Sequence, residues 1–100
     1  MYGTVARMRV KPGMESKLIE LGKSEDSVGM PGYVGQCVYK LDDSPDTYMV
    51  AVVFESREAY RANAESSEQH QRYLEMRELL AEDPEWFDGE VVHAYMRPRS

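Results

Sequence analysis

The chain has 100 residues, a length that corresponds to one domain with a thin core. Its formal net charge of −6 argues against nucleic acid as a partner, because an acidic surface repels phosphate backbones. The single cysteine, Cys37, excludes an internal disulfide and is typical of a reducing cytoplasm, and no apolar run approaches the roughly 20 residues of a membrane span. We therefore expect one cytoplasmic domain over residues 1–100, with no membrane partner.

The first predicted elements are a strand and a helix. Tyr2–Val10 alternates between two faces, one of which carries Thr4, Ala6 and Met8, and this predicts a strand. A Lys-Pro-Gly turn ends it. Met14–Ser27 has apolar residues at helical spacing, which predicts a helix before the next Gly- and Pro-containing break.

A hairpin is predicted next. Tyr33–Leu41 is rich in Tyr and Val, as strands are, and Thr47–Glu55 is a second apolar run. The polar turn Asp42–Asp46 between them is too short for anything except a hairpin connection.

One helical region follows the hairpin in two parts, Arg57–Ala64 and Ser67–Leu80. Ser56 is the expected N-cap of the first part and Ser66 or Ser67 that of the second, so we expect a kink between them. After these helices we expect a loop over Asp83–Gly89, a last strand over Glu90–Met96 and a tail from Arg97.

The resulting order is strand, helix, strand, strand, helix, strand. It predicts the α+β class: a ferredoxin-like βαββαβ domain with a four-stranded antiparallel sheet and helices on one face. On the third strand, Val50, Val52 and Phe54 point one way, while Met49 and Val53 point the other way. A strand that faces water on one side alternates with polar residues, and this strand does not. We therefore expect a second copy to cover the free face, giving a homodimer.

Several segments resemble the antibiotic biosynthesis monooxygenase family, and the likeness covers about residues 2–96. They are Val5–Gly13, Met30–Tyr33, Phe54–Tyr60 and Ser67–His70. The resemblance implies a dimeric α+β barrel, in which two ferredoxin-like sheets pack face to face. It also implies cofactor-free oxygenation of polycyclic phenols or quinone precursors, in which the substrate supplies the electrons for oxygen.

The resemblance also bears on single residues. Tyr60 matches the family's tyrosine just after the third strand, Phe54 stands where those enzymes often have tryptophan, and Val50 stands near an asparagine of the quinone-forming members. The haem-degrading members use asparagine, tryptophan and histidine at positions near Ala6, Asn63 and Tyr73. None of the three matches, which argues against haem degradation.

Three residues are candidates for catalysis: Tyr60, His70 and Tyr73. Tyr60 would donate a hydrogen bond to a substrate oxygen, or would be a core aromatic residue with its hydroxyl at the surface. His70 and Tyr73 share a helix flank with Arg77, so the histidine could abstract a proton. The alternative for His70 is a capping or surface residue.

Four residues are candidates for substrate binding: Phe54, Asn63, Arg77 and Trp86. Phe54 and Trp86 would form aromatic walls. Trp86 with Phe87, in the loop after the last helix, could be a hydrophobic lid over a flat ligand, or could plug the barrel end or contact the partner chain. Asn63 would orient a ligand or end its helix. His93 is predicted to be structural on the last strand. No clustered His, Cys or carboxylate pattern suggests a metal, and we predict no cofactor.

The sequence thus favours a cofactor-independent monooxygenase acting on a small flat aromatic, phenolic or quinone-type molecule bound between sheet and helices. The alternative is a non-catalytic ligand-binding or structural dimeric module of the same fold, which the incomplete set of acid–base groups supports. The residues alone leave both readings open.

Overall fold

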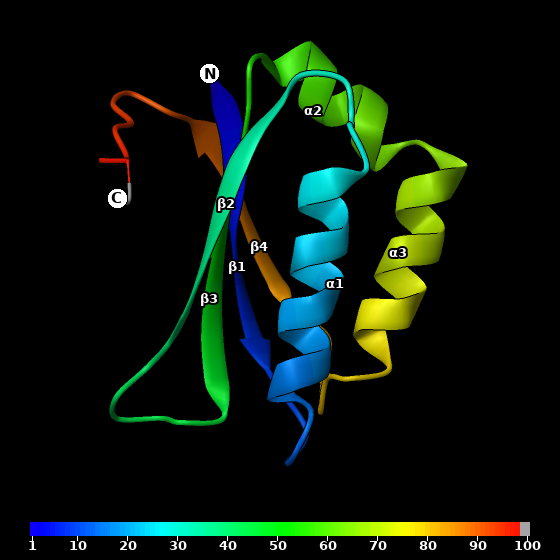
Figure 1. The fold of residues 1–100 in the computed structure, drawn as a ribbon, viewed down its shortest axis with the longest axis vertical. Coiled ribbons are helices and arrows are strands. Elements are labelled where there is room, and N and C mark those ends of the chain that lie inside the picture. Colours follow the sequence, from blue (N-terminus) through cyan, green and yellow to red (C-terminus); the bar gives the residue numbers. More distant parts are fainter. Residues whose placement is uncertain (99–100) are drawn as a thin grey trace.

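The computed structural model describes residues 1–98 and contains a four-stranded antiparallel sheet with helices beside it (Figure 1). The elements are, in chain order, β1 (Tyr2–Arg9), α1 (Glu15–Ser27), β2 (Tyr33–Lys40), β3 (Thr47–Phe54), α2 (Arg57–Ala64), α3 (Ser67–Arg77) and β4 (Glu85–Glu90). The strand order in the sheet is β2-β3-β1-β4. Figure 1 shows α1 and α3 on the same side of the sheet, with α2 at one end. The predicted ferredoxin-like α+β fold is confirmed.

The prediction of the last strand is wrong. The expected strand was Glu90–Met96, but β4 pairs with β1 through Glu85–Glu90, the segment that was expected to be a loop. From sequence alone, Pro84 favours a loop. A proline just before a strand costs no ladder hydrogen bond, however, and Trp86 and Phe87 favour strand structure. Beyond Val91, which is half-buried, the chain forms no strand up to residue 98, so His93 lies outside the sheet. Arg99 and Ser100 of the expected tail lie outside the described residues.

Both predicted helix caps are present in the second half of the chain. Ser56 accepts a hydrogen bond from the Ala59 amide at 3.0 Å, and Ser66 accepts one from the Gln69 amide at 3.1 Å. Each bond satisfies a backbone donor that the first helical turn leaves unpaired. The break between α2 and α3 therefore follows from the local sequence.

Helix α3 ends at Arg77 rather than at Leu80 as predicted, because the chain turns there to bury two leucines. Leu80 has no exposed surface and forms an isolated bridge with Val10. The Ala81 amide then donates to the Arg9 carbonyl at 2.8 Å. Burial of Leu79 and Leu80 against the end of β1 outweighs continuation of the helix.

The hydrophobic core lies between the sheet and the helices. The fully or nearly buried members come from β1 and the residue after it, from β3, from α1 and from the segment after α3: Ala6, Met8, Val10, Leu18, Tyr48, Val50, Leu79 and Leu80. Phe54 is also buried, and its ring has edge-on contacts with Tyr33 and Tyr60. Alternation along β1 and β3 thus places one face of each strand in the core, as predicted.

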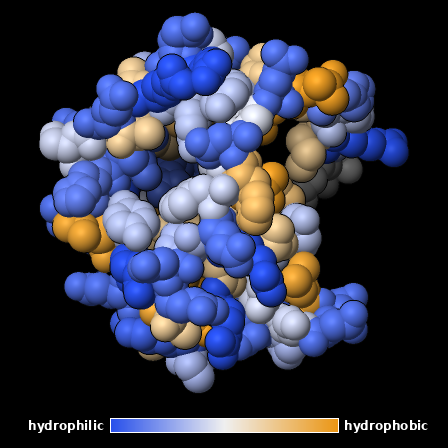
Figure 2. All heavy atoms as spheres, turned by 180° about the vertical axis from the view of Figure 1, so that it is seen from behind, coloured by the Kyte–Doolittle hydropathy of each residue, from blue (hydrophilic) through white to orange (hydrophobic). Residues whose placement is uncertain are grey.

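The opposite face of the sheet carries apolar side chains that no part of the described chain covers fully. Phe87 of β4 is 55% exposed, and Val5, its partner on β1, is also exposed. Met49 and Val53 of β3 are half-buried in the single chain. In Figure 2 hydrophobic residues reach the surface on the side of the sheet, whereas the helical side is mostly hydrophilic.

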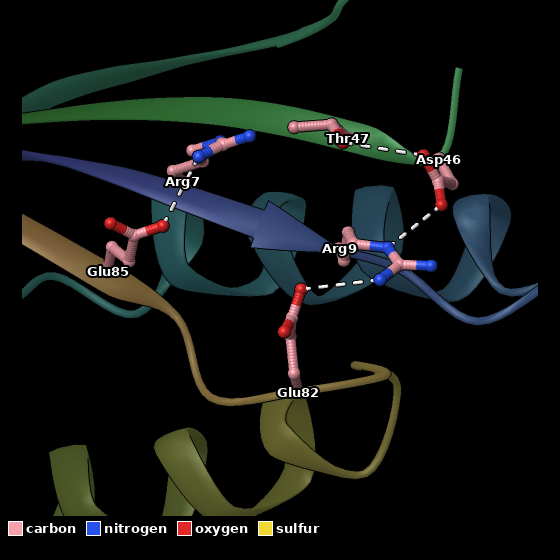
Figure 3. Close-up of polar contacts among 6 residues, drawn as sticks. All are labelled: Arg7, Arg9, Asp46, Thr47, Glu82 and Glu85. Carbon is pink, nitrogen blue, oxygen red and sulfur yellow. Dashed lines mark hydrogen bonds and ion pairs between the residues drawn. The ribbon is translucent and has the colours of Figure 1, made fainter. Parts of the chain in front are cut away.

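The basic residues of β1 are matched by carboxylates from three other segments (Figure 3). Arg7 pairs with Glu85 at 3.3 Å, and Arg9 pairs with Asp46 at 3.0 Å and with Glu82 at 3.5 Å. The hydrogen bond from Arg9 holds the pKa of the Asp46 carboxyl below its ordinary value. Such exposed pairs contribute little to stability, but they remove any net basic character from this part of the face.

Candidate functional site

A cavity of about 460 Å³ opens between the sheet and the helices. Residues of all four strands and of α1, α2 and α3 line it. Part of its wall is apolar and comes from both layers: Met8, Leu18, Leu21, Val38, Val50 and Met76. The space is therefore large enough for a small flat ligand.

Six of the seven predicted site residues line this cavity: Phe54, Tyr60, Asn63, His70, Tyr73 and Trp86. They come from β3, α2, α3 and β4, so the fold brings together residues that are more than 30 positions apart in sequence. Their roles toward a ligand stay predictions. All six side chains line one cavity, and any contact with a ligand would therefore be made there.

Arg77 is the exception, because it is not among the residues that line the cavity. Its Nε donates to Asp83 Oδ1 at 2.8 Å, and its Nη1 donates to the Leu80 carbonyl at 3.1 Å. Arg77 is the last residue of α3, so its side chain binds the loop that follows instead of turning toward the cavity.

Tyr60 has its hydroxyl proton engaged. Its Oη donates to Asp88 Oδ1 at 2.9 Å, across from α2 to β4. Burial, with the Asp88 hydrogen bond as the next contribution, raises the Tyr60 pKa to about 12. The phenol is therefore protonated at neutral pH, and its proton is directed to Asp88.

Trp86 and Tyr73 form an aromatic wall between the two layers. Their ring centroids are 6.5 Å apart at an interplanar angle of 45°. Trp86 belongs to β4 and not to a loop, so it is a fixed wall instead of the lid that was one expectation. His70, also on α3, is exposed while lining the cavity, which places it at the rim.

Arg72 is a cavity residue that the sequence reading missed. Its Nη2 donates to Asn63 Oδ1 at 3.2 Å and to Gln69 Oε1 at 3.1 Å, and it contacts Met30 Sδ at 3.4 Å. Among residues 1–98, no carboxylate lies within ion-pair distance of this half-buried guanidinium. These hydrogen bonds hold the Arg72 side chain in place. The Asn63 amide oxygen is one of the acceptors that keep the positive charge of Arg72 at the cavity.

Glu25 is a second residue that was missed. It lies on α1, is half-buried and lines the same cavity. Burial raises the pKa of its carboxyl, and the nearby charge of Arg72 opposes that shift. The helical wall therefore carries a cation and a carboxyl group of increased proton affinity, which is a pairing suited to proton transfer.

The described residues contain neither a clustered set of metal-ligating side chains nor a membrane-spanning helix. No three His, Cys, Asp or Glu side chains within residues 1–98 are grouped so that they could hold a metal ion. Over the same residues, no helix has the length and apolar character needed to span a bilayer.

Comparison with known proteins defines the class of this chain. The sequence profile of the antibiotic biosynthesis monooxygenase family matches residues 1–76. The chain belongs to this family, as the resemblance of its segments predicted. A comparison with curated protein sequences gave no significant match.

Solved structures share the fold over most of their length. A variant of SnoaB, a cofactor-independent oxygenase from Streptomyces nogalater, superposes with a TM-score of 0.75 at 17% identity, covering 93% of this chain and 94% of that chain. A conserved protein from Methanosarcina mazei Go1 gives 0.74 at 19% identity, covering 88% and 89%. Rv0793 from Mycobacterium tuberculosis gives 0.72 at 16% identity, covering 95% and 98%. At these identities the likeness concerns the fold.

Proposed function

We propose that the protein is a cofactor-independent monooxygenase that oxidises a small flat aromatic molecule of the phenol or quinone-precursor type. The observation that carries the proposal is the cavity of about 460 Å³, which combines aromatic walls with polar groups in a chain of the monooxygenase family. Phe54 and Trp86 would contact the ring system, and Tyr60, His70 and Arg72 would surround its oxygen atoms.

For this reaction the protein has to position the substrate and stabilise the negative charge that develops on it. Oxidation of a ring methylene of a quinone precursor to a carbonyl consumes one O₂ and releases one water, with all electrons supplied by the substrate. A base removes the ring C–H proton, and the electron-rich anion then reacts with oxygen. Three side chains able to act as bases line the cavity: Glu25, His70 and Asp88. Asp88 already accepts the hydrogen bond of Tyr60, so Glu25 or His70 would take the proton, and Arg72 would stabilise the oxyanion.

A non-catalytic ligand-binding role is the second candidate. It is favoured by the rim position of His70 and by the engagement of the Tyr60 proton with Asp88, which leave fewer groups free for acid–base steps. Ligand binding without oxygen uptake would be its signature.

Tyr60→Phe tests the proposed site. The variant removes the oxygen that would accept a hydrogen bond from the substrate, so we expect kcat/KM for oxygen uptake with a polycyclic phenol to fall about 3- to 10-fold. The control is Tyr95→Phe, which deletes a hydroxyl from an exposed residue beyond β4 and should leave the rate unchanged. Equal rates in both variants would remove Tyr60 from the site.

We also propose that the free face of the sheet packs on a second copy of the chain. The exposed Phe87 and Val5, with Met49 and Val53 beside them, form an apolar surface that a symmetric partner would bury. Sedimentation at micromolar concentration should give twice the chain mass of 11.5 kDa. Phe87→Arg should shift the protein to the monomer; a wild-type monomer would contradict the proposal.

A further inference from the structure

One nitrogen of the Arg72 guanidinium is free at the helical wall of the cavity. The other two are engaged: Nε donates to Gln69 Oε1 at 3.2 Å, and Nη2 donates to Asn63 Oδ1 at 3.2 Å and to Gln69 Oε1 at 3.1 Å. Nη1 has no hydrogen-bond partner among residues 1–98, and it is not one of the atoms that the fold seals from a water-sized molecule. Its two N–H groups are therefore available to an acceptor from outside the chain.

The free nitrogen belongs to a cation without a counter-ion. None of the ion pairs within residues 1–98 includes Arg72, although the chain has a net charge of −6. The guanidinium is half-buried, and Met30 Sδ lies 3.4 Å from Nη2, so the charge is partly removed from water. Attraction between opposite charges is stronger in such a place than in bulk solvent. The site therefore favours a ligand group that is ionised at neutral pH.

Two carboxyl groups line the same cavity and limit where an anion can bind. Asp88 lies on β4 and already accepts the hydrogen bond of Tyr60, so its charge belongs to the sheet side. Glu25 lies on α1, where burial raises its pKa and the charge of Arg72 opposes that shift. A carboxyl of increased proton affinity is readily neutralised beside a bound anion, so Glu25 does not exclude an anion from Arg72.

We infer that Arg72 Nη1 binds a carboxylate group carried by the ring system of the ligand. A carboxylate is ionised at neutral pH and accepts charge-assisted hydrogen bonds from a guanidinium, whereas a simple phenol stays neutral up to about pH 10. The subsite deepens the proposed function, on which it rests for the flat ring system, and names the substrate class as an aromatic carboxylic acid. Anthrone lacks the carboxylate and would engage Arg72 only through the oxyanion of the reaction.

A matched pair of ligands tests the subsite on the unmodified protein. The probes are 2-naphthoate and 2-naphthamide, which have nearly the same shape and differ in charge. At pH 7 the protein should bind 2-naphthoate at least about tenfold more tightly, because only the anion gains the attraction of Arg72. Equilibrium dialysis measures both affinities. Equal affinities for the two probes would overturn the subsite without reference to any variant.

Arg72→Gln should weaken the binding of 2-naphthoate about tenfold and leave that of 2-naphthamide within about twofold. The control is Arg77→Gln, which removes the same charge from the same helix outside the cavity and should leave both affinities within about twofold. Equal losses for both probes in Arg72→Gln, or none for either, would contradict the inference.

A second variant tests which side of Arg72 the anion occupies. Arg72 also lines an outer hollow of about 380 Å³ between α2, α3 and the loop after α1. Ala62 is exposed and lines this hollow but not the cavity, so Ala62→Trp would fill the hollow alone. The affinity for 2-naphthoate should stay within about twofold. A loss as large as that in Arg72→Gln would place the anion outside the cavity and overturn the subsite.

The subsite and the proposed function can fail separately. A preference for 2-naphthoate that depends on Arg72, without oxygen uptake from anthrone, would keep the subsite and remove the oxygenase activity. Oxygen uptake from anthrone, with no preference between the two probes, would keep the activity and remove the subsite.

Discussion

Phe54→Ala should lower the free energy of unfolding by about 3–5 kcal/mol, the largest effect on stability that we expect from one substitution in this chain. Phe54 is 1% exposed at the end of β3, and its ring centroid lies 5.7 Å from that of Tyr33 and 5.8 Å from that of Tyr60. Alanine would remove the ring and leave a void joined to the cavity, and both effects destabilise. Urea unfolding followed by circular dichroism measures the change.

Tyr95→Ala is the matched control, because it removes an aromatic ring of similar size that is exposed beyond β4. It should change the free energy of unfolding by less than about 0.5 kcal/mol. A loss below about 1 kcal/mol for Phe54→Ala would show that Phe54 is not a central core residue, and the cavity wall would have to be assigned differently.

Arg72→Gln should reduce kcat/KM for oxidation of anthrone about 10- to 100-fold. The guanidinium is held at the cavity by Asn63 and Gln69, and no carboxylate of residues 1–98 lies within ion-pair distance of it. Its charge is therefore available to a substrate oxyanion, and a charge-assisted hydrogen bond contributes about 1.5–3 kcal/mol. Initial rates of oxygen uptake measure the effect.

Arg77→Gln is the control for this experiment, since it removes the same charge from the same helix. Arg77 binds Asp83 and the Leu80 carbonyl outside the cavity, so its loss should change kcat/KM by less than about twofold. Thermal melting of both variants separates an effect on the site from an effect on folding. Equal losses of activity in the two variants would contradict the role given to Arg72.

The main features of the fold were predictable because they depend on local pattern. Alternation along β1 and β3, the serine caps and the polar hairpin turn act within a few residues, and the structure has each of them. The last strand was not predictable in the same way. The segment Glu85–Glu90 follows a proline and contains Gly89, and only pairing with β1 makes it a strand.

The site was partly predictable, and the part that was missed depends on tertiary contacts. Tyr60 and Trp86 could be singled out because aromatic residues near helices and strand ends are visible in sequence. Arg72 and Glu25 resemble ordinary surface charges in a helical pattern, and only the packing of α3 beside α1 and the sheet turns them toward the cavity.

The direct test of the central claim is oxygen uptake by the purified protein with anthrone as substrate, in the presence of a metal chelator and without added cofactor. We predict uptake above the buffer rate, proportional to protein concentration, with one anthraquinone formed for each O₂ consumed. Uptake no faster than in buffer, with anthrone bound in the cavity, would contradict the oxygenase assignment and leave a ligand-binding protein.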